Sequence, residues 1–208
     1  MENRFINKCI PIEVQRQLVT PFFLAYSSFE TITSQFPITM GPMQKNYLTR
    51  MKHAFVQHEI ERLIKSNVFK GAINCRDSNN CNNTHPFIEL YNSDFIATVS
   101  YVKKSSMIPQ NVKYRNDRSA NNQLPLFEED LANPDKLYFI LTHGSIGLKP
   151  DFVCIGLPRF DNKCWVEKTN ILNLPYIVPS KQEKEESLVS LTPLGRELIK
   201  NIKEDDDQ

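Results

Sequence analysis

The spacing of apolar residues changes from helical to strand-like at about Asn67, and this change limits the chain to folds that combine helices with a sheet. Before that point, residues 44–67 place two neighbouring apolar stripes along one side of a helix. The stripes consist of Leu48, Met51 and Phe55, and of Val56, Ile60, Leu63 and Ile64. An apolar face this broad is typical of a helix that packs against a sheet.

The segments that follow Asn67 have the patterns of strands: residues 68–75 alternate loosely between apolar and polar, and residues 137–142 form a compact apolar run. The expected strands are residues 68–75, a hairpin over 86–103 that turns at 92–94, residues 137–142, and a second hairpin over 152–157 and 164–168 that turns near 161–162. Residues 104–135 carry little apolar periodicity, and we expect a long loop there.

Helices are also expected on both sides of this strand region. Pro11 suits the first turn of a helix, and Pro21 is expected to break that helix or to start the next one. After a charged linker at 179–187, Thr192 and Pro193 predict the start of a last helix. The predicted fold is α+β, with N-terminal helices packed on a mainly antiparallel sheet and a short C-terminal helix. Residues 1–178 form one domain in this prediction, and residues 179–208 form the linker, the helix and an acidic tail.

Composition indicates where the protein is located and which classes of partner it can bind. The net charge of the 208 residues is +1, which argues against a protein that coats nucleic acid non-specifically. Five scattered cysteines, an odd number, favour reduced thiols in a cytoplasm over a disulfide scaffold. No apolar run is long enough to span a membrane, and the N-terminus lacks the apolar segment of a signal peptide. The abundance of Asn, Lys and Ile is typical of a low-GC bacterium or its mobile elements.

A first candidate site is a metal cluster formed by Cys75, Cys81 and His85, whose short spacings place two thiolates and an imidazole on one segment. Zinc uses such ligands, although its usual pair of cysteines two residues apart is missing. A fourth ligand would come from a distant residue such as Cys154, Cys164 or His143. The alternative interpretation is a polar turn in which these residues bind no metal.

A second candidate is an acidic set like that of restriction-type nucleases, in which carboxylates hold a divalent ion such as Mg²⁺ and a lysine positions the attacking water. Asp151 opens one expected strand, and Glu167 and Lys168 end the strand paired with it. Glu59 or Glu61 of the long helix would add a third carboxylate. However, adjacent strand residues such as Glu167 and Lys168 face opposite sides of a sheet, so these side chains are equally well explained as solvated charges.

A third candidate is the polar segment that contains Lys113, Tyr114, Arg115, Arg118 and Gln123. Arginine and amide side chains suit phosphates and base edges, and a tyrosine stacks on bases. The same composition suits a protein-binding loop or a polar network that satisfies itself.

His143 is a fourth candidate, because it follows a buried strand and precedes a glycine turn, a common place for an acid or base catalyst. Cys75 and Ser145 are candidate nucleophiles, but neither lies in a nucleophile elbow. The alternative role for His143 is a hydrogen-bonded turn residue.

Taken together, these patterns predict an intracellular bacterial interaction module that binds a protein partner or nucleic acid, in a phage-defence or toxin–antitoxin setting. The alternative function is a metal-dependent nuclease that uses Asp151 and Glu167.

Overall fold

The computed structural model describes residues 4–35, 45–80, 86–123 and 136–175. Its three N-terminal helices are α1 (Arg4–Cys9), α2 (Ile12–Gln35) and α3 (Lys45–Lys65). The chain divides into two units, Met1–Ile177 and Val178–Gln208, and all described residues belong to the first. The expected last helix therefore lies outside the described residues.

Helix α2 continues through Pro21, and the expected break at this residue is wrong. A proline inside a helix removes one backbone hydrogen bond and costs about 3 kcal/mol. Burial offsets this cost, because Pro21 itself and the helical face of Phe22, Tyr26 and Phe29 are all buried.

Six strands form one sheet in the order β1-β2-β3-β4-β5-β6. Their bounds are β1 (Asn74–Asn79), β2 (Pro86–Tyr91), β3 (Phe95–Tyr101), β4 (Leu137–Gly144), β5 (Phe152–Pro158) and β6 (Trp165–Asn170). All neighbouring strands are antiparallel except β3 and β4, which run parallel. The predicted α+β class and the mainly antiparallel sheet are confirmed.

Both predicted hairpins are present as β2–β3 and β5–β6. The first turns at Asn92, whose side chain accepts hydrogen bonds from the backbone of Asp94 and Phe95. The first strand, by contrast, begins at Asn74 and not at residue 68, because residues 66–72 form turns after α3.

The parallel pairing of β3 and β4 requires the intervening chain to cross over the sheet. Part of this crossover is the helix α4 (Lys113–Ser119), followed by the short 3₁₀ helix η3 (Ala120–Asn122). The expectation of a loop throughout 104–135 is therefore wrong for 113–122, and residues 124–135 lie outside the described ranges. The helix was missed because its buried contacts are made by polar side chains, which leave no apolar period to detect.

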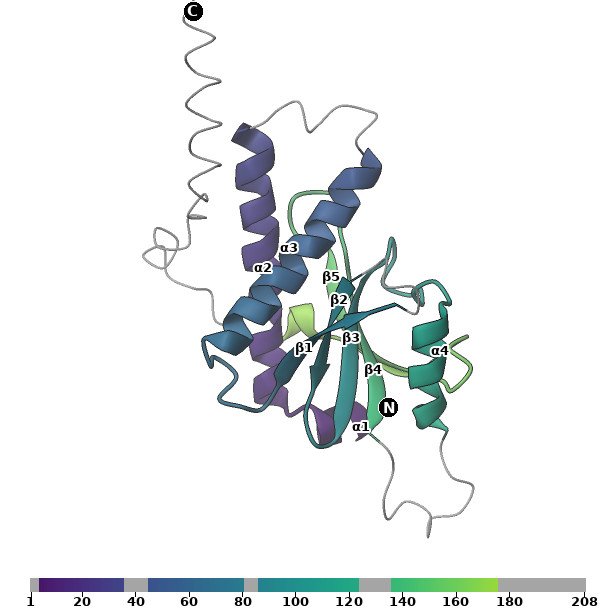
Figure 1. The fold of residues 1–208 in the computed structure, drawn as a ribbon. Coiled ribbons are helices and arrows are strands. Elements are labelled where there is room, and N and C mark those ends of the chain that lie inside the picture. The colour runs from purple at the N-terminus through teal and green to yellow at the C-terminus, as the bar shows by residue number, and fades with distance from the viewer. Residues whose placement is uncertain (1–3, 36–44, 81–85, 124–135, 176–208) are drawn as a thin grey trace, which may run out of the picture. The chain divides into compact units, whose positions relative to one another are not determined.

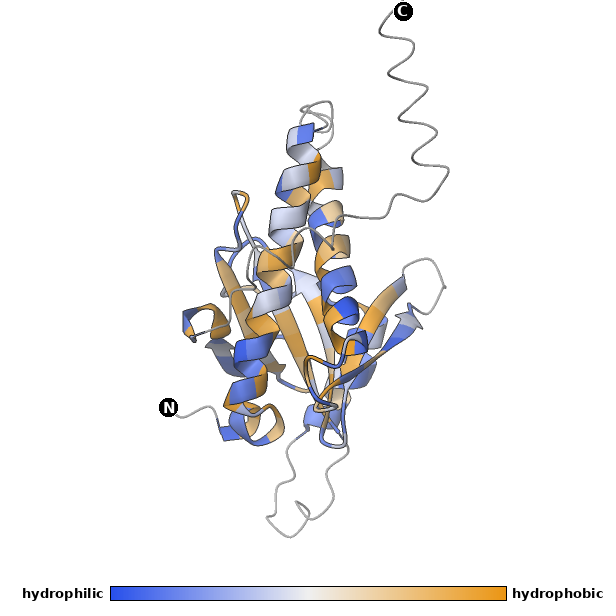
Figure 2. Cartoon of the chain, turned by 90° about the vertical axis from the view of Figure 1, so that its left-hand side faces the viewer, coloured by the Kyte–Doolittle hydropathy of each residue, from blue (hydrophilic) through white to orange (hydrophobic). Residues whose placement is uncertain are grey.

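Helices cover both faces of the sheet: α2 and α3 lie on one face and α4 on the other (Figure 1). Every residue of β4 and β5 is buried, as expected for central strands covered on both sides, whereas the edge strand β1 is mostly exposed. The main apolar core lies between α2, α3 and the sheet, where hydrophobic residues gather (Figure 2). Among the helices described, none has the length and apolar character that crossing a membrane requires.

Candidate functional site

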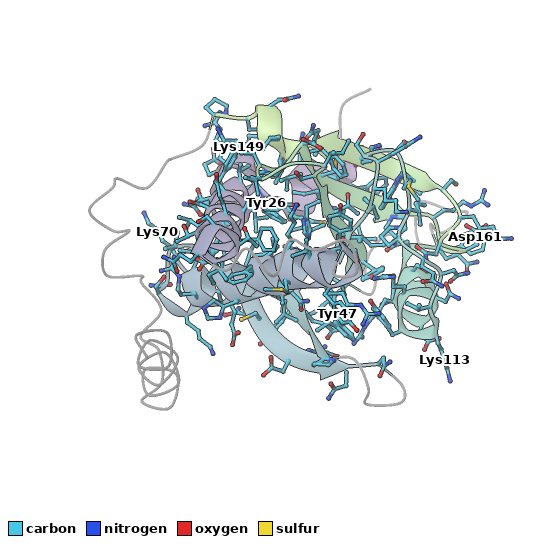
Figure 3. The ribbon with its side chains drawn as sticks, turned by 90° about the horizontal axis from the view of Figure 1, so that it is seen from above. Tyr26, Tyr47, Lys70, Lys113, Lys149 and Asp161 are labelled. Atoms are coloured by element: carbon cyan, nitrogen blue, oxygen red, sulfur yellow. The ribbon has the colours of Figure 1, made fainter. Side chains whose placement is uncertain are left out.

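The carboxyl ends of the parallel strands β3 and β4 lie next to one another and carry Tyr101 and His143, which are register partners. In sheets with parallel strands, these ends commonly form ligand sites. Here they face α2 and α3, which contribute Tyr26 and His53. Tyr26 lies between the two helices and the strands, whereas Lys113 and Asp161 lie on the far side of the molecule near α4 (Figure 3).

A hydrogen-bonded chain joins three of these side chains. The hydroxyl of Tyr26 lies 3.0 Å from Nδ1 of His143, and Nε2 of His143 lies 3.2 Å from Nδ1 of His53. A phenol has one proton, and the partner found for it within the described ranges is His143. We infer that Tyr26 donates to Nδ1 of His143, and that the Nε2–H of His143 donates to His53.

The surroundings of His143 favour its neutral form. The side chain is completely buried, and the rings of Phe22, Tyr26 and Tyr101 lie 5.4, 5.9 and 5.5 Å from its ring. This burial lowers the pKa of His143 well below its usual value, and the nearby His53 and Lys52 lower it further. Burial also raises the pKa of the Tyr26 hydroxyl, which keeps its proton.

The β4–β5 loop (residues 145–151) begins two residues after His143 and is held by hydrogen bonds at several points. The hydroxyl of Tyr101 donates to the carbonyl of Ser145 at 3.1 Å, and the hydroxyl of Ser145 donates to the carbonyl of Gly147 at 2.8 Å. The backbone of Ile146 donates to Oδ2 of Asp151 at 2.9 Å. Such contacts fix a loop that contains no regular secondary structure.

Lys52 ties this loop to α3. Its ammonium donates to the carbonyl of Gly147 at 2.7 Å and lies over the rings of Tyr26 and Phe29, at 5.5 and 5.2 Å. Partial burial lowers the pKa of Lys52, while the carboxylate of Asp151 acts in the opposite direction. The contact of Lys52 with the loop and the contact of His53 with His143 therefore come from adjacent residues of α3.

The tip of the β4–β5 loop presents apolar side chains to the solvent. Ile146 is 97% exposed, and Leu148, two residues later, is 39% exposed. An isolated exposed apolar residue needs no explanation, but a fully exposed isoleucine on a loop fixed by its own hydrogen bonds is a good contact point for a partner. Lys149 is exposed beside it.

The structure does not bring the predicted nuclease residues together. Glu167 faces Leu157 across β5 and β6, while Asp151 lies beyond the first residue of β5, so the two are separated by a strand length of about 20 Å. Glu167 accepts hydrogen bonds from the backbone of Phe5 and Ile6, and it thereby caps α1. Asp151, in contrast, accepts a hydrogen bond from the backbone of Ile146 within the β4–β5 loop.

The remaining nuclease candidates also have separate contacts. Glu59 accepts a hydrogen bond from Arg62 on the same helix at 2.9 Å, and Lys168 donates to the carbonyl of Ser105 at 3.1 Å. Across the described parts of the chain, no group of three or more His, Cys, Asp or Glu side chains is arranged to hold a metal ion.

Of the three residues of the predicted metal cluster, Cys75 lies within the described residues, whereas Cys81 and His85 do not. Cys75 is a free thiol on the edge strand β1, and burial raises its pKa. The metal cluster therefore stays a prediction.

The predicted contact segment turns three of its side chains toward the sheet. The ring of Tyr114 stacks on Phe87 with 4.5 Å between ring centroids. Arg115 donates to the hydroxyl of Ser100 at 2.8 Å and to the carbonyl of Gln110 at 2.7 Å. These groups are therefore already engaged by the chain itself.

Arg118 completes this inward network. Its guanidinium lies 2.7 Å from Oε1 of the buried Glu89, an ion pair by distance although its angle is not that of a hydrogen bond. Arg76 holds the other carboxylate oxygen of Glu89 at 2.8 Å. Lys113 and Gln123 are exposed. The segment behaves mainly as the polar network that the sequence left open as an alternative.

Sequence reasoning singled out His143 but missed its partners. His53 lies at the edge of the apolar face of α3, and this polar residue on a helix border is the one local signal that was present. Its contact with His143 spans 90 positions in the chain, and that of Tyr26 spans 117, so no local spacing could reveal them.

Comparison with models of protein families, with curated proteins and with solved structures found no match to this chain.

Proposed function

We propose that the chain is a protein-binding module of the bacterial cytoplasm, and that the β4–β5 loop is its main contact with the partner. The observation that carries the proposal is the 97% exposure of Ile146 on a loop fixed by hydrogen bonds. Burying a side chain of this size contributes about 1.5–3 kcal/mol to association. A loop that is already ordered loses little conformational entropy on binding, so more of that contribution remains.

The partner expected from these residues has an apolar pocket with an acidic rim. Ile146 and Leu148 would fill the pocket, and the ammonium groups of Lys149 and Lys52 favour carboxylates around it. A protein partner is favoured over nucleic acid because Tyr114, Arg115 and Arg118 are engaged with the sheet. A phage-defence or toxin–antitoxin setting is the context in which we expect such a module.

The test places a photoreactive amino acid at position 146 and, as a matched control, at position 68. Val68 is also an exposed aliphatic residue, but it lies in the turn after α3. Crosslinking in the native host should give a discrete protein adduct from position 146 and none from position 68. An adduct removed by nuclease, or the same adducts from both positions, would contradict the proposal.

Binding measurements with the crosslinked partner then quantify the contact. The variant Ile146→Asp should weaken affinity by about tenfold or more, equivalent to about 1.4 kcal/mol. Val68→Asp should leave affinity unchanged. Equal affinities of Ile146→Asp and the unmodified chain would exclude this loop as the main contact.

A further inference from the structure

The hydrogen-bonded chain of Tyr26, His143 and His53 ends beside the contact that ties the β4–β5 loop to α3. His53 is the chain neighbour of Lys52, and Lys52 donates to the carbonyl of Gly147. At the other end, His143 precedes the loop by two residues. A change at the two histidines therefore reaches the loop through α3 and through β4.

We propose that the hydrogen-bonded side chains of Tyr26, His143 and His53 form a proton-sensitive latch. With both imidazoles neutral, the β4–β5 loop is held in its binding arrangement. Uptake of one proton by the histidine pair releases the loop. The proposed consequence, loss of the partner at low pH, rests on the proposed function of the loop. The latch itself concerns the free chain and is testable without a partner.

The hydrogen-bond donors and acceptors of the neutral chain match one another. Tyr26 donates to His143, and His143 donates to His53, so each junction has one proton and one acceptor. An added proton on Nδ1 of His53 places two N–H groups against one another at the 3.2 Å junction. If His143 changes its tautomer to relieve this, its Nδ1–H points at the hydroxyl of Tyr26, whose own proton then loses its acceptor. In either case one hydrogen-bonding group of the chain is left without its partner, which is unfavourable at a buried position.

The charged groups around His53 and His143 transmit the effect of the added proton to the β4–β5 loop. Among the described residues, the titratable groups near the pair are Tyr26 from α2, Lys52 from α3 and Tyr101 from β3. Asp151 from the loop acts in turn on Tyr26 and Lys52. A new positive charge repels the ammonium of Lys52, which is the donor to Gly147, and it attracts the carboxylate of Asp151, which is the acceptor for Ile146. Both loop contacts are therefore disturbed by the same proton.

The experiment measures amide hydrogen exchange by NMR in the free chain, expressed as protection factors so that the intrinsic pH dependence of exchange is removed. The amide of Ile146 reports on the loop, and the amide of Val68, which donates to the carbonyl of Leu63 at 3.1 Å, is the internal reference. From about pH 7.5 to about pH 5, across the range in which imidazoles titrate, protection of Ile146 should fall about tenfold while that of Val68 is retained.

Two variants at half-buried positions make the test specific, because replacing the fully buried His143 would also change the stability of the fold. In His53→Gln, the side-chain carbonyl of the glutamine can accept the hydrogen bond from His143 but does not titrate. Protection of the Ile146 backbone amide should then no longer depend on pH. In Lys52→Met, protection should be low at every pH. The latch is excluded if the unmodified chain shows constant protection, or if His53→Gln shows the same fall.

These outcomes separate the latch from the binding proposal. Crosslinking from position 146 at about pH 7.5, the upper end of the exchange series, tests the partner alone. A pH-dependent loop without an adduct would leave the latch intact and remove the proposed function, and an adduct with a pH-independent loop would do the reverse.

Discussion

His143 illustrates how one polar residue is accommodated among aromatic rings at the end of a fully buried strand. Its two ring nitrogens each have a partner, Tyr26 and His53, so burial leaves no hydrogen-bonding group without a contact. The neutral state that this arrangement requires has a cost in acid, because His143 takes up a proton in the unfolded chain that it does not take up at its buried position in the folded chain.

The free energy of unfolding should therefore depend on pH through His143. Its pKa in the folded chain is lowered, so its contribution is fully present above the unfolded value of about 6.5 and is lost as the pH falls below it. The expected slope is at most about 1.4 kcal/mol per pH unit for one proton. Denaturant unfolding between about pH 7.5 and pH 5 measures this slope, and His143→Gln should reduce it.

The exposed His58 provides the control, since His58→Gln should retain the slope of the unmodified chain. Equal slopes in the two variants would show that His143 is not the responsible group.

At the scale of elements, apolar periodicity predicted the helices and strands that pack through apolar side chains. It missed the helix that packs through polar side chains. Helix α3 and the hairpin β2–β3 carry their burial in their sequence pattern, and both were predicted with nearly correct bounds. Helix α4 is seven residues long and docks through Tyr114, Arg115 and Arg118, so its sequence looks like that of a loop. The partners of these residues lie on β2 and β3, and only the fold reveals them.

The contact between α4 and β2 should be measurable in stability. Glu89 is 1% exposed and holds Arg76 and Arg118, so removing Arg118 leaves a buried carboxylate with a single cationic partner. Because Arg118 is itself about one-third exposed, we expect Arg118→Ala to lower the free energy of unfolding by about 1–3 kcal/mol and not by the larger cost of a fully buried pair. Lys113→Ala, on the same helix but exposed, should change it by less than about 0.5 kcal/mol. Similar values for the two variants in denaturant unfolding would argue against a docked α4.

For the whole molecule, the sheet lies between helices that come from distant parts of the chain (Figure 1). The fold class was predictable because periodicity separates helical from strand segments. The candidate site was only half predictable, since the end of β4 indicated His143, whereas its hydrogen bonds to His53 and Tyr26 span 90 and 117 positions of the sequence. The predicted acids failed to meet because the register of β5 and β6 sets Glu167 opposite Leu157.

Glu167 has a role that spans the whole fold, because it joins the first helix to the last strand described. Its carboxylate accepts from the backbone of Phe5 and Ile6 at 3.0–3.1 Å. Glu167→Ala should lower the free energy of unfolding by about 1–2 kcal/mol, as the loss of a helix cap does, and should increase hydrogen exchange in α1. Val166→Ala, at the neighbouring exposed position, should leave exchange in α1 unchanged. If both variants retain full protection of α1, Glu167 does not hold that helix.

The contact between α1 and β6 has a consequence for how the chain is made. The two partners are 162 positions apart, so α1 leaves the ribosome long before the strand that secures it exists. At cellular rates of synthesis that interval is roughly 10–30 s. During this time the apolar face of α2, which carries Phe22 and Phe29, has α3 as an early neighbour but not the central strands that complete its burial. We therefore expect a nascent chain of this kind to benefit from ribosome-associated chaperones, which cover apolar surface during synthesis.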